Sequence, residues 1–223
     1  KPYPQYLTFK SEPNAKISVN GKVYQSAEWL QALENMGYPK TSEVYNSIKR
    51  YDKYAIDEGA SRVYLEKDKP LTVTYTNLRN SSFNGKKISR VVYTYTLKKI
   101  TASGKNKIPA ILYYDPTTTI NYSDLGTNAE VQMTANFYDA DGKQIDMTGA
   151  LLNFSSLNRN NDAGKDKSEY VRDFNGEFVK ISGSSIDVQN GIAISSTKSN
   201  EYVANGARFN YTEWDTTNAP YKW

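Results

Sequence analysis

The stretch Val91-Val-Tyr-Thr-Tyr-Thr-Leu97 decides the fold class, because its side chains alternate between two sets. Every second residue, from Val91 to Leu97, is large and apolar or aromatic, and the residues between them are Val92 and two threonines. A period of two places these sets on opposite faces of a β-strand. β-branched and aromatic residues also suit a half-buried pleated surface. The stretch therefore predicts a strand with one face in the core.

Residues 71–75 and 131–137 repeat this alternation, and turn signals punctuate the chain. Asn-Gly and Asp-Gly pairs supply the positive φ angles that tight hairpins need. There are six of them: Asn20-Gly21, Asn84-Gly85, Asp141-Gly142, Asn175-Gly176, Asn190-Gly191 and Asn205-Gly206. The pattern predicts a mainly β fold, an antiparallel β-sandwich. With 223 residues and no internal repeat or clear boundary, we expect one domain over residues 1–223.

Two stretches near the start have helical periodicity instead. Apolar residues recur at three or four positions from Trp29 to Met36, with Ser26 as an N-cap and Gly37 as a stop. A second helix is expected to begin at Thr41 or Ser42 and to run toward Gly59, with apolar positions at Val44, Tyr45, Ile48, Tyr51 and Tyr54. We expect these two short helices to pack across one end of the sheets.

The composition excludes several kinds of catalysis. The chain contains neither Cys nor His. Thiolate nucleophiles, disulfides and Cys- or His-based metal sites and triads are therefore absent. A glycosidase needs only two carboxylates facing each other, so that alternative stays open. No local acid pair stands out, however, and we expect a binding domain and no enzyme.

The charge is weakly positive, with 28 basic and 24 acidic residues and a net charge of +4. No apolar run is long enough for membrane insertion. The basic residues closest together in sequence are Lys86, Lys87, Arg90, Lys98, Lys99, Lys105 and Lys107. Lysines on strands often protect exposed sheet edges, and this is the favoured interpretation. The alternative is electrostatic capture of an anionic polymer, such as extracellular DNA or lipoteichoic acid.

Aromatic residues give the main hint of function. The chain has 19 Tyr, 7 Phe and 3 Trp, and tyrosine combines a flat apolar face with a polar group. One aromatic cluster lies in a polar, Pro-containing run that makes a poor core strand. It supports a ligand cleft as well as it supports ordinary packing. The candidate ligand-binding residues are Trp214, Tyr211 and Trp223 for stacking on sugars, with Asp215, Asn158 and Asp173 as hydrogen-bonding groups.

Oxygen-rich segments raise the question of a bound Ca²⁺. Asp139-Ala-Asp-Gly142 resembles the start of a calcium loop, but the remaining ligands are missing, and a hairpin turn is the better interpretation. The polar residues 156–167 show no periodicity and are expected to form a long exposed loop. Residues 158–166 and 115–117 carry enough oxygen to hold one Ca²⁺ together, although no spacing identifies such a site.

Several motifs resemble a known family, the glucan-binding protein C / antigen I/II variable-domain family of streptococcal surface adhesins. The resemblance extends from about Leu7 to Trp223 and lies in long, ordered motifs. These are Leu7-Thr-Phe-Lys-Ser-Glu-Pro-Asn-Ala15, the stretch from Leu71 to Leu97, Asp115-Pro-Thr117, Phe137-Tyr-Asp-Ala-Asp-Gly142, Phe154-Ser-Ser-Leu-Asn158, Tyr170-Val-Arg-Asp-Phe-Asn-Gly176 and Trp214-Asp-Thr-Thr-Asn-Ala-Pro220. The compactness of the chain resembles that of BspA-type adhesins.

This resemblance implies a lectin-like sandwich with a cleft, in a head domain excised from a larger, wall-anchored protein on the bacterial cell surface. It implies ligands such as host glycoproteins (salivary agglutinin, gp340), glucan or partners on other microbes. Some members carry Ca²⁺, and an enterococcal relative binds extracellular DNA. A monomeric head is expected. A stalk module without any ligand is the remaining alternative, in which the aromatic residues would be buried or scattered.

Overall fold

The computed structural model describes residues 7–154, 157–162, 165–172, 175–179, 184–196, 202–204, 207–209 and 219–222. The chain divides into two compact units, one formed by Thr8–Asp146 and the other by Lys1–Leu7 with Met147–Trp223. We call them the large and the small unit and describe each by itself. That residues 1–223 act as one domain stays a prediction.

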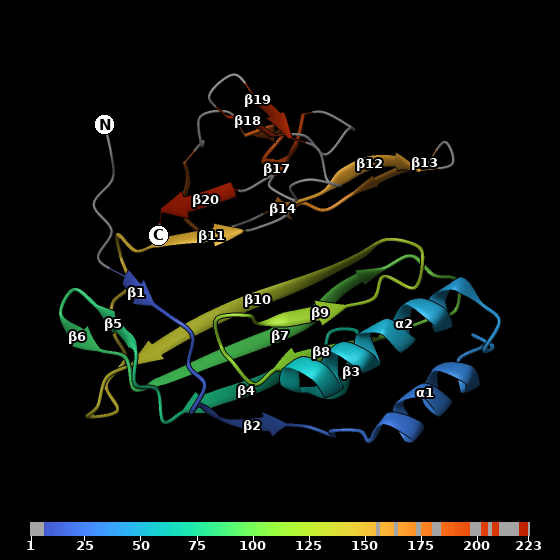
Figure 1. The fold of residues 1–223 in the computed structure, drawn as a ribbon, viewed down its shortest axis with the longest axis horizontal. Coiled ribbons are helices and arrows are strands. Elements are labelled where there is room, and N and C mark those ends of the chain that lie inside the picture. The colour runs from blue at the N-terminus through green and yellow to red at the C-terminus, as the bar shows by residue number, and fades with distance from the viewer. Residues whose placement is uncertain are drawn as a thin grey trace. The chain divides into compact units, whose positions relative to one another are not determined.

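The large unit contains two main antiparallel sheets (Figure 1). The four-stranded sheet has the order β10-β7-β4-β2. Its strands are β2 (Lys16–Asn20), β4 (Leu71–Thr76), β7 (Arg90–Ile100) and β10 (Ala129–Tyr138). The three-stranded sheet consists of β3 (Ala60–Glu66), β8 (Lys107–Tyr113) and β9 (Ile120–Tyr122), with β8 in the middle. A further small sheet joins β1 (Leu7–Phe9), β5 (Ser81–Phe83) and β6 (Lys86–Lys87).

The alternation predicted for residues 91–97 is confirmed. Val91, Tyr93, Tyr95 and Leu97 are all buried, because β7 is an inner strand of its sheet. On β10 the same face is buried only in part, since Phe137 is covered while Met133 is 42% exposed. β10 lies at the edge of the sheet, so its middle lacks a neighbouring strand on one side.

Buried tyrosines connect the two main sheets of the large unit. The Tyr75 hydroxyl donates to the carbonyl of Tyr113 (2.6 Å), and the Tyr93 hydroxyl donates to the carbonyl of Pro116 (2.7 Å). Burial raises the pKa of Tyr93 well above its ordinary value, so this phenol stays neutral and keeps donating. A core of two stacked antiparallel sheets, the predicted sandwich, results.

Two α-helices pack on the three-stranded sheet, α1 (Ser26–Asn35) and α2 (Glu43–Tyr54), as predicted in number and position. The Ser42 side chain caps α2 by accepting the N–H of Tyr45 (3.2 Å). At α1 the predicted cap was wrong. The N-cap is Gln25, and the Ser26 hydroxyl instead donates to Asp52 (2.7 Å). A π-helix, η1 (Ala55–Gly59), extends α2 to the expected stop.

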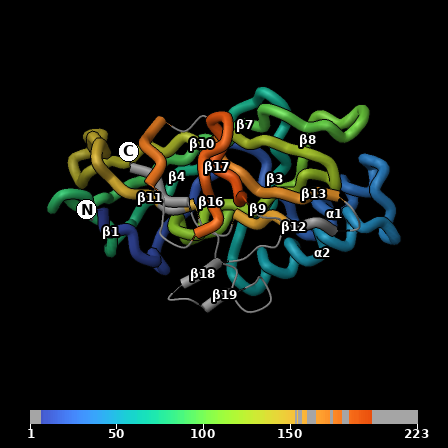
Figure 2. The backbone as a smooth tube through the Cα atoms, turned by 90° about the horizontal axis from the view of Figure 1, so that it is seen from above, coloured from blue at the N-terminus to red at the C-terminus, as the bar shows by residue number. Residues whose placement is uncertain are grey.

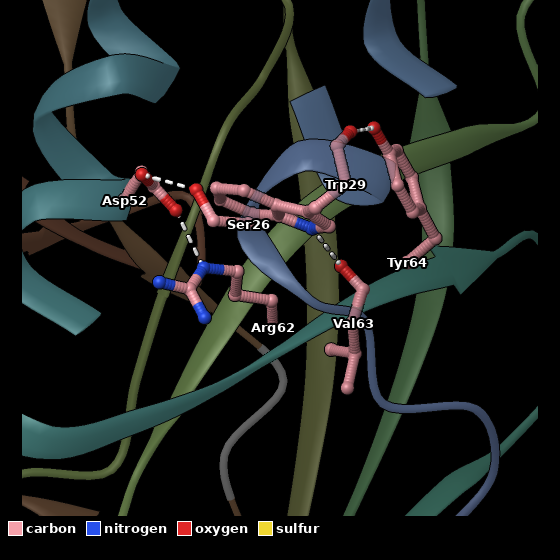
Figure 3. A network of polar contacts seen from close by, with 6 residues as sticks. All are labelled: Ser26, Trp29, Asp52, Arg62, Val63 and Tyr64. Carbon is pink, nitrogen blue, oxygen red and sulfur yellow. Dashed lines mark hydrogen bonds and ion pairs between the residues drawn. The ribbon is translucent and has the colours of Figure 1, made fainter. Parts of the chain in front are cut away.

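A polar network fixes α1 and α2 to strand β3 (Figure 3). The indole N–H of Trp29 donates to the carbonyl of Val63 (2.9 Å), and the Tyr64 hydroxyl donates to the carbonyl of Trp29 (2.7 Å). The Arg62 guanidinium pairs with Asp52 at 2.5 Å, with both side chains only 13% exposed. Since each buried polar group has a partner, the helices are held in one register on the sheet.

The small unit is built from short antiparallel strands. These are β11 (Leu151–Phe154), β12 (Arg159–Asp162), β13 (Lys165–Ser168), β14 (Val171–Arg172), β15 (Glu177–Phe178), β16 (Ile186–Gln189), β17 (Ile192–Ser195), β18 (Tyr202–Ala204), β19 (Ala207–Phe209) and β20 (Ala219–Lys222). Leu157, Ile186 and Ala193 form a small apolar core, with Phe154, Val171 and Phe178 packed against it. β12 and β13 run side by side (Figure 2).

The prediction of a long loop over residues 156–167 was wrong where the structure describes it. β12 and β13 pair in register from Arg159 opposite Ser168 to Asp162 opposite Lys165. Arg159 on β12 donates two hydrogen bonds to Asp166 on β13 (3.0 and 3.2 Å). A charge-assisted ion pair thus stabilises this polar hairpin, which the hydrophobic pattern of the sequence does not predict.

The turn predictions have mixed outcomes. Asn84-Gly85 and Asn190-Gly191 have positive φ at both residues and close two-residue hairpins, β5–β6 and β16–β17, as expected. Asn20-Gly21 leads from β2 toward α1 and closes no hairpin, because β2 pairs with β4. Asn205-Gly206 lies outside the described residues.

Glu12 is the most completely buried carboxylate among the described residues, at 1% exposure. It accepts the backbone N–H groups of Arg79 (2.7 Å) and Asn80 (2.5 Å) and the hydroxyl of Ser81 (3.0 Å). These contacts hold residues 79–81, at the start of β5, against the start of the large unit.

We expect Glu12→Gln to lower the free energy of unfolding by about 2–3 kcal/mol, because charge-assisted bonds are lost in a buried setting. Urea denaturation measures this. Glu28→Gln is the matched control, since its side chain is 54% exposed. Equal effects of the two substitutions would contradict the role assigned to Glu12.

A second comparison tests the buried tyrosines. The Tyr95 hydroxyl is buried and has no hydrogen-bond partner among the described residues, whereas Tyr75 donates to Tyr113. We expect Tyr95→Phe to be neutral or to stabilise by up to about 1 kcal/mol, and Tyr75→Phe to cost about 1–2 kcal/mol. The same denaturation curves give both values, and a larger loss for Tyr95→Phe would show that this hydroxyl does have a partner.

Candidate ligand-binding site

Most residues of the sequence-predicted site lie outside the described residues. This holds for Tyr211, Trp214, Asp215, Trp223 and Asp173. Asn158 is described, and its backbone bonds to Glu169: its N–H donates to the Glu169 carboxylate (3.1 Å), and its carbonyl accepts the Glu169 N–H (2.7 Å). Asn158 therefore joins the outer ends of β12 and β13, and the predicted group as a whole stays a prediction.

In the large unit, a set of tyrosines gathers where α2 and η1 meet the ends of β8 and β9. We call it the tyrosine junction, and it consists of Tyr51, Tyr54, Tyr113, Tyr114 and Tyr122. The rings of Tyr51 and Tyr54 stack with centroids 6.3 Å apart and planes inclined by 27°. The Tyr51 hydroxyl reaches the carbonyl of Tyr122 at 3.4 Å, which connects α2 to β9.

Tyr114 lies directly against Gly59, the last residue of the π-helix. Its N–H donates to the Gly59 carbonyl (3.1 Å). A Cβ atom at position 59 would come within 2.9 Å of the Tyr114 ring, and Gly59 has a φ of +84°. Glycine is thus required here for both conformation and space. The close approach fixes the Tyr114 ring at the surface.

Polar groups stand beside these rings. The Tyr113 hydroxyl accepts a hydrogen bond from the Asn121 side chain (2.7 Å). Burial raises the pKa of Tyr113, and the nearby carboxylate of Glu58 raises it further. Tyr113 is therefore a neutral phenol beside a carboxylate and an amide, the kinds of groups that bind sugar hydroxyls.

Strained backbone surrounds β9. Thr119 and Leu125, on either side of the strand, have φ of +68° and +56°. Such angles are rare for branched and bulky residues and cost about 1–3 kcal/mol each. Backbone strain of this kind occurs frequently at functional sites, and so do π-helices such as η1. Thr119, whose carbonyl accepts the Tyr113 N–H, and the π-helix η1 both adjoin the tyrosine junction.

The junction presents its rings to solvent. Tyr54 is 40% exposed, Tyr114 47% and Tyr122 36%, and Ile56 of η1 is 66% exposed. Flat apolar faces with hydroxyl edges suit stacking on sugar rings. Sequence analysis assigned Tyr54 to the packed face of a helix. Ile56 was the available sequence signal that Tyr54 is not fully packed. Tyr54 and Ile56 are two positions apart, so they cannot lie on the same face of a helix.

The lysine series does not form one stripe. Lys86 and Lys87 lie on β6, and Arg90 at the start of β7 packs over the ring of Tyr138 at 4.0 Å. Lys98 and Lys99 lie near the other end of β7, about 30 Å away for a strand of this length. The single basic patch envisaged from sequence is thus two separate groups.

The structure supports a turn at Asp139, as preferred from sequence. The Asp139 side chain accepts the N–H groups of Asp141 (2.9 Å) and Lys143 (3.0 Å). Within the described ranges, no three acidic side chains come close enough together to hold a metal ion. A bound Ca²⁺ stays a prediction from sequence.

Comparison with known proteins places the chain among bacterial binding proteins. The model of the family described as glucan-binding protein C (GbpC) matches residues 1–223. The aggregation substance of Enterococcus faecalis is 34% identical over an alignment of 183 residues, and this match covers 71% of this chain. The match spans only 14% of that relative's own length.

Solved structures with a similar fold include a member of the same family and an adhesin domain. The glucan-binding protein C of Streptococcus mutans is 27% identical with a TM-score of 0.73, over 97% of this chain and 69% of that one. The adhesin domain of PrgB from Enterococcus faecalis has a TM-score of 0.77 at 23% identity, over 100% of this chain and 81% of that one. It is also solved bound to DNA, with the same TM-score and identity. At that identity the PrgB likeness shows the fold alone.

Asp115 anchors the loop that carries Tyr114. Its carboxylate accepts the Ser11 hydroxyl (2.6 Å), the Glu12 N–H (2.9 Å), and the N–H and hydroxyl of Thr117 (3.0 and 2.7 Å). Partial burial alone would favour the protonated acid, but these bonds prevail and lower the pKa of Asp115. The charged form therefore stabilises the fold.

We expect Asp115→Asn to lower the stability at pH 7 by about 1 kcal/mol, a modest amount because solvent screens this site. A lowered folded-state pKa contributes stability above the ordinary value near 4, and this is lost as the pH falls through the folded-state pKa. The difference between the two proteins should therefore shrink below about pH 4. Denaturation from pH 7 to 3 measures it, with exposed Asp141→Asn as control. A difference that does not vary with pH would refute this role.

Proposed function

The chain belongs to the glucan-binding protein C family, and on this premise we propose that it is the ligand-binding domain of a bacterial surface adhesin. It binds a carbohydrate, free or on a host glycoprotein, through the tyrosine junction. The observation that carries the proposal is the exposure of the Tyr54 and Tyr114 rings at the two ends of the π-helix, with Tyr54 preceding Ala55 and Tyr114 lying against Gly59.

The chemistry of the junction suits a sugar. Aromatic faces cover the apolar C–H surface of a pyranose, while Glu58 and Asn121 offer an acceptor and an amide to its hydroxyls. Each stacked ring contributes about 1 kcal/mol beyond the area that it buries. Contacts with Tyr113 and Gly59 hold the side chains of the tyrosine junction in place. These side chains therefore lose little conformational entropy when a ligand binds.

The relatives point to this class of function. The Streptococcus mutans protein binds glucan by name, and its structure is described as evidence for both sucrose-independent and sucrose-dependent adherence. The names of the relatives describe binding, aggregation and adhesion and no enzyme. For this chain we propose α-glucan and a glycoprotein of the salivary agglutinin (gp340) type as ligands.

The location follows from the same premise. We propose a monomeric head domain on the outside of the cell, carried by a parent protein that is anchored in the cell wall. The chain spans 14% of the length of its enterococcal relative, consistent with a domain of something larger. No helix in the described part of the chain is long and apolar enough to cross a membrane.

The sequence-predicted residues are the second candidate surface for the same ligand. Tyr211, Trp214 and Trp223 would stack on sugar, and Asp215, Asn158 and Asp173 would bind its hydroxyls. Trp214→Ala separates this surface from the tyrosine junction, because the two sets share no residue.

We expect Tyr54→Ala/Tyr114→Ala to weaken binding to dextran and to immobilised salivary agglutinin by about 10- to 100-fold, because two stacking faces are lost. Surface plasmon resonance at 0.15 M salt, with and without EDTA, measures the affinity. Tyr54→Phe/Tyr114→Phe keeps the rings and should retain most of it.

Met133→Ala is the matched control, because it removes an equally exposed apolar side chain from β10. The proposal for the junction fails if the double alanine variant is folded and binds normally. Loss of binding in Trp214→Ala alone would move the site to the second surface. Loss of ligand binding in EDTA would indicate a Ca²⁺ ion that bridges protein and ligand or stabilises the domain.

A further inference from the structure

One edge of the four-stranded sheet, along β10, has no assigned role. β10 ends the strand order β10-β7-β4-β2, and no described strand pairs with its other side (Figure 1). It is 10 residues long, whereas β2, at the opposite edge of the same sheet, has 5. An uncovered strand edge presents a row of backbone N–H and C=O groups that can pair with a further strand.

The chain itself covers one end of this strand. The N–H of Ile145 donates to the carbonyl of Phe137 (2.8 Å), so the backbone groups of Phe137 point away from β7. Backbone groups alternate in direction along a strand, and every second residue back to Val131 therefore points the same way. The part of this side that is left uncovered runs from Val131 to Ala135, and we call it the open edge.

The open edge lacks the residues that usually keep sheet edges from pairing. Natural proteins place lysines, other charges or prolines on exposed edge strands. β2 begins with the exposed Lys16, whereas residues 131–137 (Val-Gln-Met-Thr-Ala-Asn-Phe) contain neither a charge nor a proline. The nearest charged residue on β10, Glu130, is paired with Lys99 and is only 12% exposed. A strand edge of this composition is suited to pairing.

Side chains on both faces of the open edge are exposed, namely Gln132, Met133 and Thr134. Met133 lies opposite Tyr95 of β7 on the core-facing side of the sheet, yet it is 42% exposed. A further strand beside β10 would cover this apolar side chain and extend the core-facing side. Removal of apolar surface from water therefore favours pairing at the open edge.

We propose that the open edge pairs with the open edge of a second copy of this chain, antiparallel and about a two-fold axis at Met133. In this register Val131 lies opposite Ala135 of the second copy, and Met133 lies opposite its own copy. All three residues direct their backbone groups to the uncovered side, so the pairing forms about six hydrogen bonds between the copies. The same surface is used on both copies, as in other two-fold dimers.

The sequence of the open edge is complementary to itself in this register. On one face Gln132 lies opposite Thr134 of the second copy. On the core-facing side all the paired residues are apolar, and Met133 is the largest of them. The open edge contains no charge, so no like charges face each other across the axis.

The neighbouring registers are blocked. An axis at Thr134 would pair Val131 with Phe137, whose carbonyl is already bonded to Ile145. An axis at Gln132 would bring the β-bulge that precedes Val131 into the paired segment. An axis between two residues would set outward backbone groups against inward ones. The register centred on Met133 is the one that remains.

The pairing is weak, because so short a segment buries much less than the roughly 1,200 Å² of a stable interface. We expect a dissociation constant on the order of 0.1–1 mM. The isolated chain is then monomeric at micromolar concentration, in agreement with the monomeric head proposed for it. Pairing becomes significant where many copies are concentrated on a surface. The open edge shares no residue with the tyrosine junction, so the two proposals are independent.

Sedimentation equilibrium of the 223-residue chain, from about 0.01 to 1 mM, measures the pairing. Gln132→Lys/Thr134→Lys sets like charges opposite each other and should weaken self-association about 10-fold, and Gln132→Glu/Thr134→Glu should do the same. An equimolar mixture of these two variants should pair again, because each lysine then faces a glutamate. Ser18→Lys/Asn20→Lys is the matched control. It adds the same charge to exposed positions of β2, and should change self-association less than about 2-fold.

A disulfide tests the register, because the chain contains no cysteine of its own. Met133→Cys places two thiols at the axis with Cα atoms about 5.5 Å apart, within the range of a disulfide. It should cross-link in oxidised glutathione at about 0.5 mM protein, a concentration in the range of the expected dissociation constant. Gln132→Cys places its thiols diagonally, with Cα atoms about 7–8 Å apart, and should cross-link much less.

Equal cross-linking of the two cysteine variants would overturn the proposal, and so would self-association that the lysine and glutamate variants leave unchanged. Absence of self-association at the highest concentration would overturn it as well. Binding of an unrelated extended peptide in that case would assign the open edge to a different protein. Tyr54→Ala/Tyr114→Ala should self-associate like the unchanged chain, so a failed carbohydrate site and a failed open edge give different results.

Discussion

The hydrogen bonds from two buried tyrosines to the end of the middle strand β8 determine much of the architecture of the large unit. Tyr75 and Tyr93 donate from the four-stranded sheet to the carbonyls of Tyr113 and Pro116. The residues between these carbonyls are Tyr114 and Asp115. The hydroxyls that join the sheets thus also fix the start of the loop on which the exposed tyrosine stands. An aromatic residue with a polar end is needed, because phenylalanine would remove both of these buried hydrogen bonds.

The tyrosine content visible in the sequence therefore has two explanations. Some rings, such as Tyr93 and Tyr95, fill the core, and others, such as Tyr54 and Tyr114, face solvent. Period-two alternation identified the first group from sequence, since burial on an inner strand follows directly from spacing. The second group could not be found in this way, because Tyr54, Tyr114 and Tyr122 lie on three separate segments and their exposure depends on how α2 and η1 pack on β8 and β9. Chain-local patterns carry no information on such a meeting.

The same distinction explains the other successes and errors of sequence analysis. The cap of α2 at Ser42 and the I′ turn at Asn84-Gly85 depend on neighbouring residues, and both were predicted. Ser26 was assigned a local role, yet its hydroxyl bonds to Asp52 on another helix. The β12–β13 hairpin depends on the pair between Arg159 and Asp166, which hydrophobic periodicity does not register. The aromatic cluster around Trp214 lies outside the described residues, and its role is still an expectation from sequence.

The fold decides which lysines are neighbours, and the order of lysines along the chain does not show this. Along the chain, Lys86 and Lys98 belong to one series, whereas Lys67 is remote from both. In the structure Lys98 lies near Lys67, because the β3–β4 turn bonds to the end of β7, and Lys86 lies beyond the other end of that strand. Charge and aromatic surface consequently occupy opposite ends of β3 and β8. Salt screens the first over a Debye length of about 8 Å at physiological ionic strength but leaves stacking on the second intact. We therefore expect contacts at the two ends of the large unit to respond differently to the salt concentration of the surrounding fluid.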